Sequence, residues 1–354
     1  MSLARASSRP TVETRNRGFD EAMGVDPATR GHMAATTGRG RTRFAGVAVA
    51  RRGGFGHVAG MATALLSGPA LEALTERSDA KGLARLGLHV AAIALAGAAY
   101  AAASGTLWAA PAAFVYGTCI AFLFAPLHET VHYTAFRSRW LNRAVSVAFG
   151  WVLVLPPAYF RAFHLEHHRY TQDPERDPEL AGAPLRTWRQ YLWRVSGLHY
   201  WTRQVRSTVL HAAGRVTETY FTRSERRQIV REARFILASY AAVAVVSAVA
   251  GSSLLVWFWI VPVLLGQPML RLYLLAEHTG CPISPDMLEN SRTVHTNAIV
   301  RFLAWNMPYH AEHHAYAAIP FHALPRAHAV LGPEVRNQTR GYVRFHRELA
   351  RGLG

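Results

Sequence analysis

Nine of the chain's eighteen histidines fall in four short windows whose spacing is typical of metal ligands. Residues three and four positions apart lie on the same face of a helix. The patterns H-x-x-x-H and H-x-x-H-H therefore each present two or three imidazoles together, and imidazole nitrogens bind zinc, copper, iron and nickel. The candidate metal ligands are His128, His132, His164, His167, His168, His278, His310, His313 and His314.

Taken alone, HETVH at residues 128–132 matches the H-E-x-x-H signature of zinc proteases, with Glu129 as the general base. Catalytic zinc takes three protein ligands and a water, so most of the candidate histidines would then have no role. Their number instead favours two metal ions, each with four or five nitrogen ligands and an open position. Iron with an open position beside a membrane indicates O2 activation.

The other nine histidines are expected to be structural, because a lone surface or core histidine is seldom a ligand. Two of them, His295 and His328, lie near the candidate ligands in sequence. The nine are His32, His57, His89, His199, His211, His295, His322, His328 and His346.

Two long apolar runs must position these windows. Residues 86–127 contain no charged side chain, and this run is about twice as long as the roughly 20 residues needed to cross a bilayer. The run is interrupted at Ser104-Gly105. We therefore predict a hairpin of two helices, about 86–103 and 107–127. A second uncharged run, 235–270, breaks at 251–253 and predicts another hairpin whose second helix continues past Arg271.

One apolar segment, residues 144–160, is at the short limit for spanning and contains Pro156-Pro157. If it crossed the membrane, His128 and His164 would lie on opposite faces. The shared chemistry of the windows favours a segment that re-enters or lies in the interface, so that all histidine windows share one face.

Composition supports a membrane protein with a basic cytoplasmic side. Half of the 354 residues are hydrophobic and 17% are charged, and the net charge is +17. Residues 137–234 carry seventeen arginines and eight acids, so the positive-inside rule places them in the cytoplasm with the termini. The two cysteines form no disulfide framework, and the apolar runs argue against a nucleic-acid-binding protein.

Three regions follow from these patterns. Residues 1–70 are predicted to be a basic, disordered tail, since residues 1–60 hold ten arginines against four acids without periodicity. The main domain is expected over residues 71–340, and a C-terminal tail over 341–354. A targeting peptide, or a start further along the chain, is an alternative for the first region.

The motifs HETVHYTAF, HLEHHRYTQDPERDPE and WNMPYHAEHHAYAAIPFHALPRAH resemble those of the membrane fatty acid desaturase superfamily, most closely its bacterial members. The resemblance covers about residues 75–335. It implies an all-α integral membrane fold: four transmembrane helices in two hairpins, topped by a cytoplasmic helical cap. It also implies a di-iron centre held by the nine histidines, with His278 of AEHTG as the additional ligand between the second hairpin and the last window.

The resemblance and the spacing also suggest residues that support the ligands. Asp173 and Asp177 could orient ligand imidazoles, but each precedes a proline, so plain turn chemistry is an equal alternative. Glu129 is expected to accept a hydrogen bond from a ligand imidazole. Asn306, four residues before His310, is expected to be a supporting or water-bridging group rather than a ligand.

Departures from the family pattern bear on partners. The sequence contains no His-Pro-Gly-Gly haem motif of a fused cytochrome, so electrons are expected from a separate ferredoxin or cytochrome. A basic surface is a candidate docking site for such an acidic carrier, with positive-inside topology as the plain alternative. Its residues are Arg137, Arg139, Arg223, Arg226 and Arg227.

The resemblance implies an O2-dependent oxidoreductase, most simply a fatty acyl or lipid desaturase that introduces a double bond. The same histidine windows occur in hydroxylases and monooxygenases, including rhizopine-oxygenase-like enzymes and enzymes that modify carotenoids or sphingolipids, so oxygen insertion stays open. A zinc protease is the remote alternative. The histidine windows indicate the metal chemistry but not the substrate.

Overall fold

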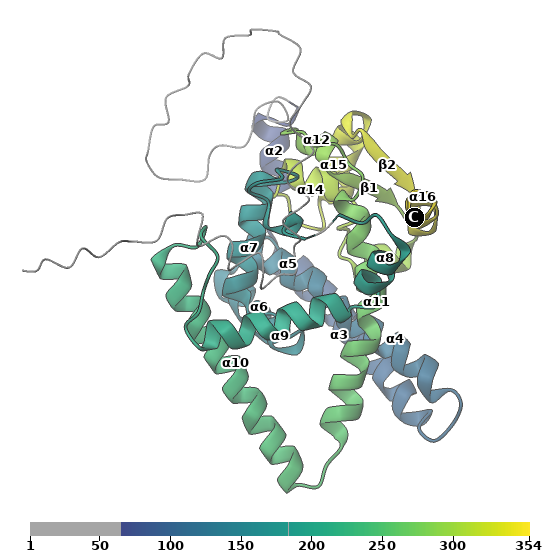
Figure 1. Cartoon of the computed structure of the whole chain (residues 1–354). Helices are drawn as coiled ribbons and strands as arrows, with labels where there is room; N and C mark the ends of the chain where they lie inside the picture. Colours follow the sequence, from purple (N-terminus) through teal and green to yellow (C-terminus); the bar gives the residue numbers. More distant parts are fainter. Residues whose placement is uncertain (1–64, 183) are drawn as a thin grey trace, which may run out of the picture. The chain divides into compact units, whose positions relative to one another are not determined.

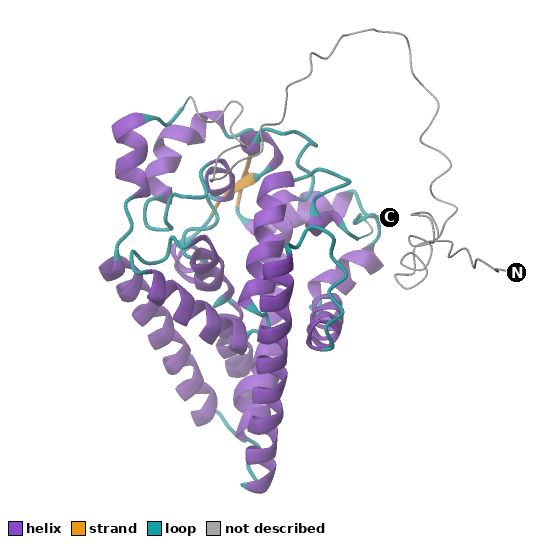
Figure 2. Ribbon diagram, turned by 90° about the vertical axis from the view of Figure 1, so that its left-hand side faces the viewer, coloured by secondary structure: helices purple, strands orange, loops and turns teal. Residues whose placement is uncertain are grey.

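The structure is a computed structural model that describes residues 65–182 and 184–354 (Figure 1). Residues 1–64 of the predicted basic tail lie outside the described residues. Nearly all regular structure is helical, and two short strands pair in parallel (Figure 2). The elements are α2 (Gly68–Thr75), α3 (Asp79–Ala102), α4 (Ala109–Ala121), α5 (Phe124–His132), α6 (Arg139–Val152), α7 (Pro157–Tyr170), η3 (Pro178–Leu180), α8 (Trp188–Val195), α9 (Leu198–Ala212), α10 (Arg223–Val249), η4 (Val256–Ile260), α11 (Val261–His278), α12 (Met287–Asn290), β1 (Arg292–His295), α13 (Ala298–Leu303), α14 (His310–Ala315), α15 (Leu324–Leu331), η5 (Gly332–Glu334), β2 (Asn337–Arg340) and α16 (Tyr342–Arg351).

Four helical segments of the described chain are long and apolar enough to cross a membrane, which confirms the predicted all-α fold with four spans. They are Asp79–Ala102, Ala109–His132, Arg223–Val249 and Val256–His278. All four segments begin before the uncharged runs or end after them, and capped polar first turns extend α3 and α10. At the start of α10, for example, Thr222 and Glu225 form a reciprocal capping box.

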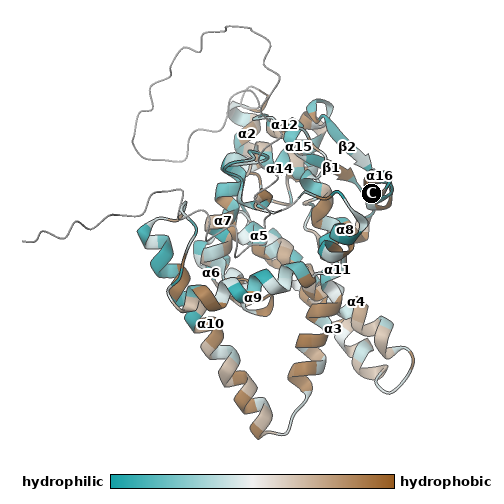
Figure 3. Cartoon of the chain, viewed as in Figure 1, coloured by the Kyte–Doolittle hydropathy of each residue, from teal (hydrophilic) through white to brown (hydrophobic). Residues whose placement is uncertain are grey.

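The spans expose their apolar side chains, as expected for helices that face lipid. Only 11% of the most apolar window is buried in α3 and in α10, so these helices would present hydrocarbon to water outside a bilayer. Figure 3 shows hydrophobic residues along the same helices and hydrophilic residues around α8, α12 and β2. The chain is therefore built as an integral membrane protein.

α4 lies between α3 and α11, and its contact with α11 is unusually close. A methyl group added at Gly266 would overlap the Gly117 carbonyl, and one added at Gly117 would overlap the Pro262 carbonyl. Small residues allow such backbone contact between membrane helices. α10 and α11 meet at their connecting turn and diverge from it (Figure 1). The Gly117–Gly266 contact thus fixes α4 against α11, and α4 leads into α5.

The ambiguous apolar segment turns back on itself. α6 and α7 meet at an angle of 101° across residues 153–156, and Pro157 begins α7. Proline suits the first turn of a helix because it lacks the amide hydrogen that would otherwise be unpaired there. The ring centroids of His128 and His164 are 4.4 Å apart, so this segment does not separate the histidine windows.

The remaining elements cover the same end of the spans. β1 and β2 pair with Arg292 opposite Asn337 and His295 opposite Arg340. The residues that the sequence assigns to a C-terminal tail include α16, which packs on α11 and buries Phe345 beside Ala276 and Val294. In β1, Arg292 lies over the Phe345 ring at 4.8 Å and donates to the carbonyl of Ala276 at 2.6 Å.

We expect Gly266→Ala to lower the melting temperature of the purified protein in detergent. Overpacking at a tight contact costs about 1–3 kcal/mol. The matched control is Gly87→Ala in α3, where an added methyl meets nothing within 4 Å. That change should leave the melting temperature unchanged or raise it, since alanine stabilises an exposed helix by roughly 0.5–1 kcal/mol. Equal melting temperatures for the two variants would contradict the close packing of α4 on α11.

Candidate metal centre

Four helices bring the nine candidate ligands together. α5 supplies His128 and His132 one turn apart, and α7 supplies three histidines on its last turns. α11 ends at His278, and α14 supplies three more. Because α5 and α11 end where α7 and α14 lie, histidines up to 186 residues apart in sequence share one buried volume.

Five of these histidines form the first group. One ring nitrogen from each lies within 4.8 Å of the others: the group is His128, His132, His164, His168 and His313. The Nε2 atoms of His164 and His168 are 3.0 Å apart. Both ring nitrogens of His128 and of His313 are buried without a hydrogen-bond partner in the described structure, as is Nε2 of His132. Buried polar atoms are normally paired, so these nitrogens are available to a ligand.

The second group is His167, His278 and His314, again with ligand atoms within 4.8 Å of one another. The Nδ1 of His167 donates to Asp177 at 2.9 Å, and the Nδ1 of His278 donates to the carbonyl of Asn290 at 3.2 Å. Thr171 uses its own hydrogen on the carbonyl of His167, so its hydroxyl accepts from Nδ1 of His314 at 3.2 Å. In the neutral form of each ring, these bonds leave Nε2 without a hydrogen.

Nε2 atoms from α7, α11 and α14 come close together beside these rings. The Nε2 of His278 is 3.2 Å from that of His167 and 2.9 Å from that of His310. Two nitrogens about 2.1 Å from one ion and at right angles to each other are about 3.0 Å apart. The donor set thus fits a bound cation, which would turn the repulsion between lone pairs into coordination.

The two groups are adjacent. The rings of His168, in the first group, and His314, in the second, stack with centroids 4.0 Å apart. His310 lies beside the second group, with its Nδ1 3.4 Å from a carboxylate oxygen of Glu277. The arrangement can hold two metal ions side by side.

The histidines of α14 are electrostatically suited to bind metal. Burial, reinforced by neighbouring imidazoles, holds the pKa of His310, His313 and His314 well below the usual value. The neutral form therefore dominates at physiological pH. Neutral imidazole is the form that coordinates a metal ion.

The structure distinguishes the two aspartates that the sequence leaves equal. Asp177 is buried and accepts from His167, and from the backbone amides of Gln172 and Glu179. Asp173 instead accepts from the amides of Glu175 and Arg176 and pairs with the Arg176 side chain. The expected imidazole contact is therefore made by Asp177, whereas Asp173 caps an exposed turn.

Glu129 and Asn306 contact neither a candidate ligand ring nor each other directly. Glu129 is fully buried and accepts from the Thr134 hydroxyl at 2.8 Å and the Phe321 amide at 3.2 Å. Asn306 donates to the carbonyl of Phe321 at 3.0 Å. Among the described residues Glu129 accepts no hydrogen bond from an imidazole, contrary to expectation, and the Phe321 backbone bonds to both Glu129 and Asn306. Both side chains hold the loop that follows α14.

Sequence reasoning did not single out the groups that fix the other tautomers. Thr171 orients His314, and Asn290 orients His278 from a separate short helix. Within α14, the buried Glu312 carboxylate accepts hydrogen bonds from Thr293 and from His328, each at 2.5 Å. Glu312 lies within the last histidine window, and this position is the one sequence signal that could have drawn attention to it. The contacts of Asn290 depend on tertiary structure alone.

One histidine expected to be structural helps to place α14. Nε2 of His89 donates to the carbonyl of Cys119, so its Nδ1 accepts from the indole of Trp305 at 3.1 Å. Trp305 and Asn306 both have left-handed backbone conformations, with φ of 50° and 60°. Such strained residues persist where surrounding contacts hold them. The indole contact thus anchors the segment before His310 to α3 and α4.

Aromatic side chains close the first group on the side of the spans. Phe124 lies with its ring centroid 5.3 Å from that of Phe160, and Phe160 stacks on His164 at 5.3 Å. Both rings pack with buried Leu127 and Leu153. This wall keeps water away from His128 and His164.

One of the five arginines proposed to dock a carrier has another role. The Arg226 guanidinium donates to the carbonyls of Val216, Glu218 and Phe221, so it holds the loop before α10. Arg137, Arg139, Arg223 and Arg227 are exposed.

Comparison with known proteins agrees with this geometry. The fatty acid desaturase family model matches residues 105–346, so the chain belongs to the fatty acid desaturase family. It is an oxidoreductase of the desaturase type in a metal-dependent family, and the zinc-protease interpretation of HETVH is wrong.

Two cyanobacterial relatives have a more specific description. The sn-1 oleoyl-lipid 12-desaturase of Picosynechococcus sp. is 26% identical over 238 residues, which cover 62% of this chain and 67% of the relative. The sn-1 oleoyl-lipid 12-desaturase of Anabaena variabilis is 25% identical over 256 residues, with the same coverage. Both relatives are named as desaturases that act on an oleoyl lipid.

We expect Asp177→Asn to weaken metal binding about 10–100-fold, because an amide cannot replace the carboxylate that fixes His167. Titration of the metal-free protein with Fe²⁺ measures the change. Asp173→Asn removes a carboxylate four residues away that contacts only the turn, and should leave metal affinity nearly unchanged. If the two variants lose affinity equally, Asp177 has no special role.

Proposed function

We propose that this protein desaturates an acyl chain of a membrane lipid at a di-iron centre held by its nine clustered histidines. The observation that carries the proposal is the convergence of buried ring nitrogens in two adjacent groups. One ion would be held by His128, His132, His164, His168 and His313. The other would be held by His167, His278, His310 and His314.

When bound, two iron ions would supply O2 activation strong enough to remove hydrogen from an unactivated C–H bond. The chain's residues hold the ligand rings in fixed tautomers through Asp177, Asn290 and Thr171. The balanced reaction converts –CH2–CH2–, O2, two electrons and two protons into –CH=CH– and two waters. Two further electrons come from the two C–H bonds.

The apolar wall of Phe124 and Phe160 favours an acyl chain as the substrate. It lies between the membrane spans and the rings of His128 and His164, so a hydrocarbon could approach the first group without carrying water. The two cyanobacterial relatives are described as acting on oleoyl-lipid, and an acyl chain esterified to a membrane lipid is the corresponding substrate class here.

Electrons would come from a separate one-electron carrier on the cytoplasmic side. The arginine excess of residues 137–234 supports that orientation through the positive-inside rule. In this topology the turns at 103–108 and 250–255 face outward, and both termini and all histidine windows face the cytoplasm.

Expression of the full chain in a bacterial host of known lipid composition tests the proposal. Mass spectrometry of total lipids should show acyl chains lighter by two hydrogens. His167→Ala and His313→Ala should abolish this product and lower bound iron. His199→Ala is the control, because His199 contacts Trp193 away from the cluster. A product that gains oxygen would identify a hydroxylase instead, and product from His313→Ala would contradict the assigned site.

A further inference from the structure

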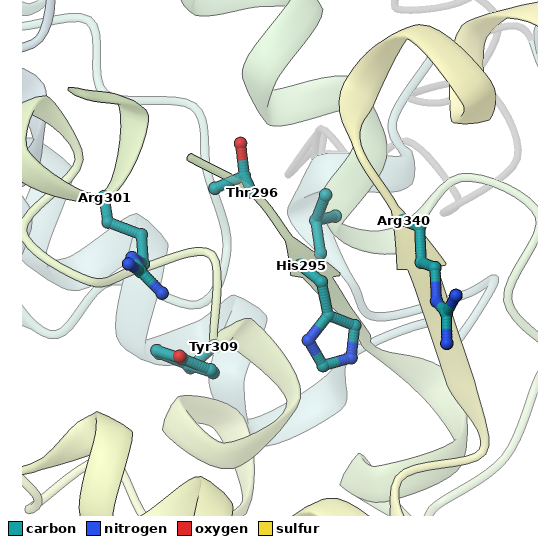
Figure 4. Close-up of a pocket in the computed structure, with 6 residues that line it drawn as sticks. His295, Thr296, Arg301, Tyr309 and Arg340 are labelled. Carbon is teal, nitrogen blue, oxygen red and sulfur yellow. The ribbon is translucent and has the colours of Figure 1, made fainter. Parts of the chain in front are cut away.

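A basic pocket lies beside the segment that leads into α14. Its volume is about 460 Å³, and Figure 4 shows side chains from four segments around it. His295 ends β1 and Arg340 ends β2, and the strand register places these two residues side by side. Arg301 comes from α13, and Tyr309 immediately precedes α14. The remaining lining residues are Val294 and Thr296.

The pocket presents hydrogen-bond donors that lack acceptors. Neither Arg301 nor Arg340 has a side-chain hydrogen bond or ion pair with any part of the chain that the structure describes, and no acidic residue lines the cavity. The Tyr309 hydroxyl also lacks a partner among the described residues. Two free guanidiniums in a concavity attract carboxylate or phosphate oxygens.

Tyr309, which lines the pocket, connects it to the candidate metal ligands. The ring of Tyr309 lies 4.8 Å from that of His328, whose Nδ1 donates to Glu312. Tyr309 is covalently bonded to His310, and Glu312 to His313. Tyr309 is therefore one residue from a proposed ligand of the second ion, and the contacts through His328 and Glu312 lead to His313 of the first group.

Charge around the pocket favours a protein partner. Residues 292–354 hold eight arginines and three glutamates, and one of those glutamates is the fully buried Glu312. Arg336, Arg340 and Arg347 are exposed. A broad positive surface around a small pocket suits an acidic macromolecule that inserts a carboxylate, because charge complementarity steers and orients such encounters.

We propose that this pocket docks an acidic one-electron carrier protein, which inserts a carboxylate between Arg301 and Arg340. The inference rests on the proposed function, since it names the partner that would reduce the centre. One electron leaves the reduced carrier in each encounter, and two encounters supply the two electrons that one double bond requires. The proposal places the docking site at the Arg301–Arg340 pocket rather than at the exposed arginines Arg137, Arg139, Arg223 and Arg227.

Carrier binding to the full chain in phosphatidylcholine nanodiscs tests the proposal, with and without bound metal. The probes are an oxidised acidic [2Fe–2S] ferredoxin and, separately, cytochrome b5. At least one should bind, and added salt should weaken the complex because it screens exposed charges. R301Q/R340Q should raise the Kd about tenfold. R301K/R340K keeps the charge and should retain most of the affinity.

R223Q/R227Q is the matched control, because it removes the same charge from the other basic surface. A larger rise in Kd for this control than for R301Q/R340Q would overturn the proposal, as would failure of the wild-type protein to bind either carrier. A third contrary result combines two measurements. Inorganic phosphate would raise the melting temperature of the wild type but not of R301Q/R340Q, and the two proteins would bind the carrier equally well. That outcome would assign the pocket to a small anion.

A kinetic readout separates this inference from the proposed function. Under anaerobic conditions, R301Q/R340Q should slow reduction of the iron-loaded protein by reduced carrier about tenfold, and reduction by dithionite should be unchanged. Loss of both rates would indicate a damaged centre rather than lost docking, and would count against the proposal. Lipid desaturation without carrier binding would overturn the docking site and leave the proposed function standing.

Discussion

The structure depends on the convergence of buried imidazole nitrogens that the fold brings together. His167, His278 and His314 each direct Nδ1 at a fixed acceptor, which leaves Nε2 of the neutral ring without a hydrogen. The Nε2 atoms of His167 and His278 are 3.2 Å apart. Burying such atoms about 3 Å apart is unfavourable without a cation and favourable with one. Bound metal would therefore stabilise the arrangement of rings that the fold imposes.

The rest of the molecule keeps those rings in place. Contact at Gly117 and Gly266 sets α4 against α11, and each helix leads to ligands at the same end. The bend after α6 returns α7 to that end, and Trp305 ties the segment before α14 to His89. The polar histidine cluster thus packs directly on one end of the apolar spans. A hydrocarbon substrate that enters between the spans could therefore reach the metal centre.

Patterns along the chain predicted the four spans and the clustering of the histidine windows, because hydropathy and helical spacing are local properties. They could not separate Asp173 from Asp177, since both precede proline and differ only in tertiary contacts. For the same reason Glu129 was expected to contact an imidazole, whereas it contacts Thr134 and Phe321. The pocket at Arg301 and Arg340 was equally invisible, because its residues come from four separate segments. The assignment of the nine histidines as ligands stays a prediction.

Metal analysis of the purified full-length protein tests the central claim most directly. The metal content per chain, measured by plasma mass spectrometry against quantitative amino-acid analysis, should approach two iron ions, one for each group of histidines. One zinc ion per chain without iron would contradict the account, because a single tetrahedral site leaves most of the converging nitrogens unexplained.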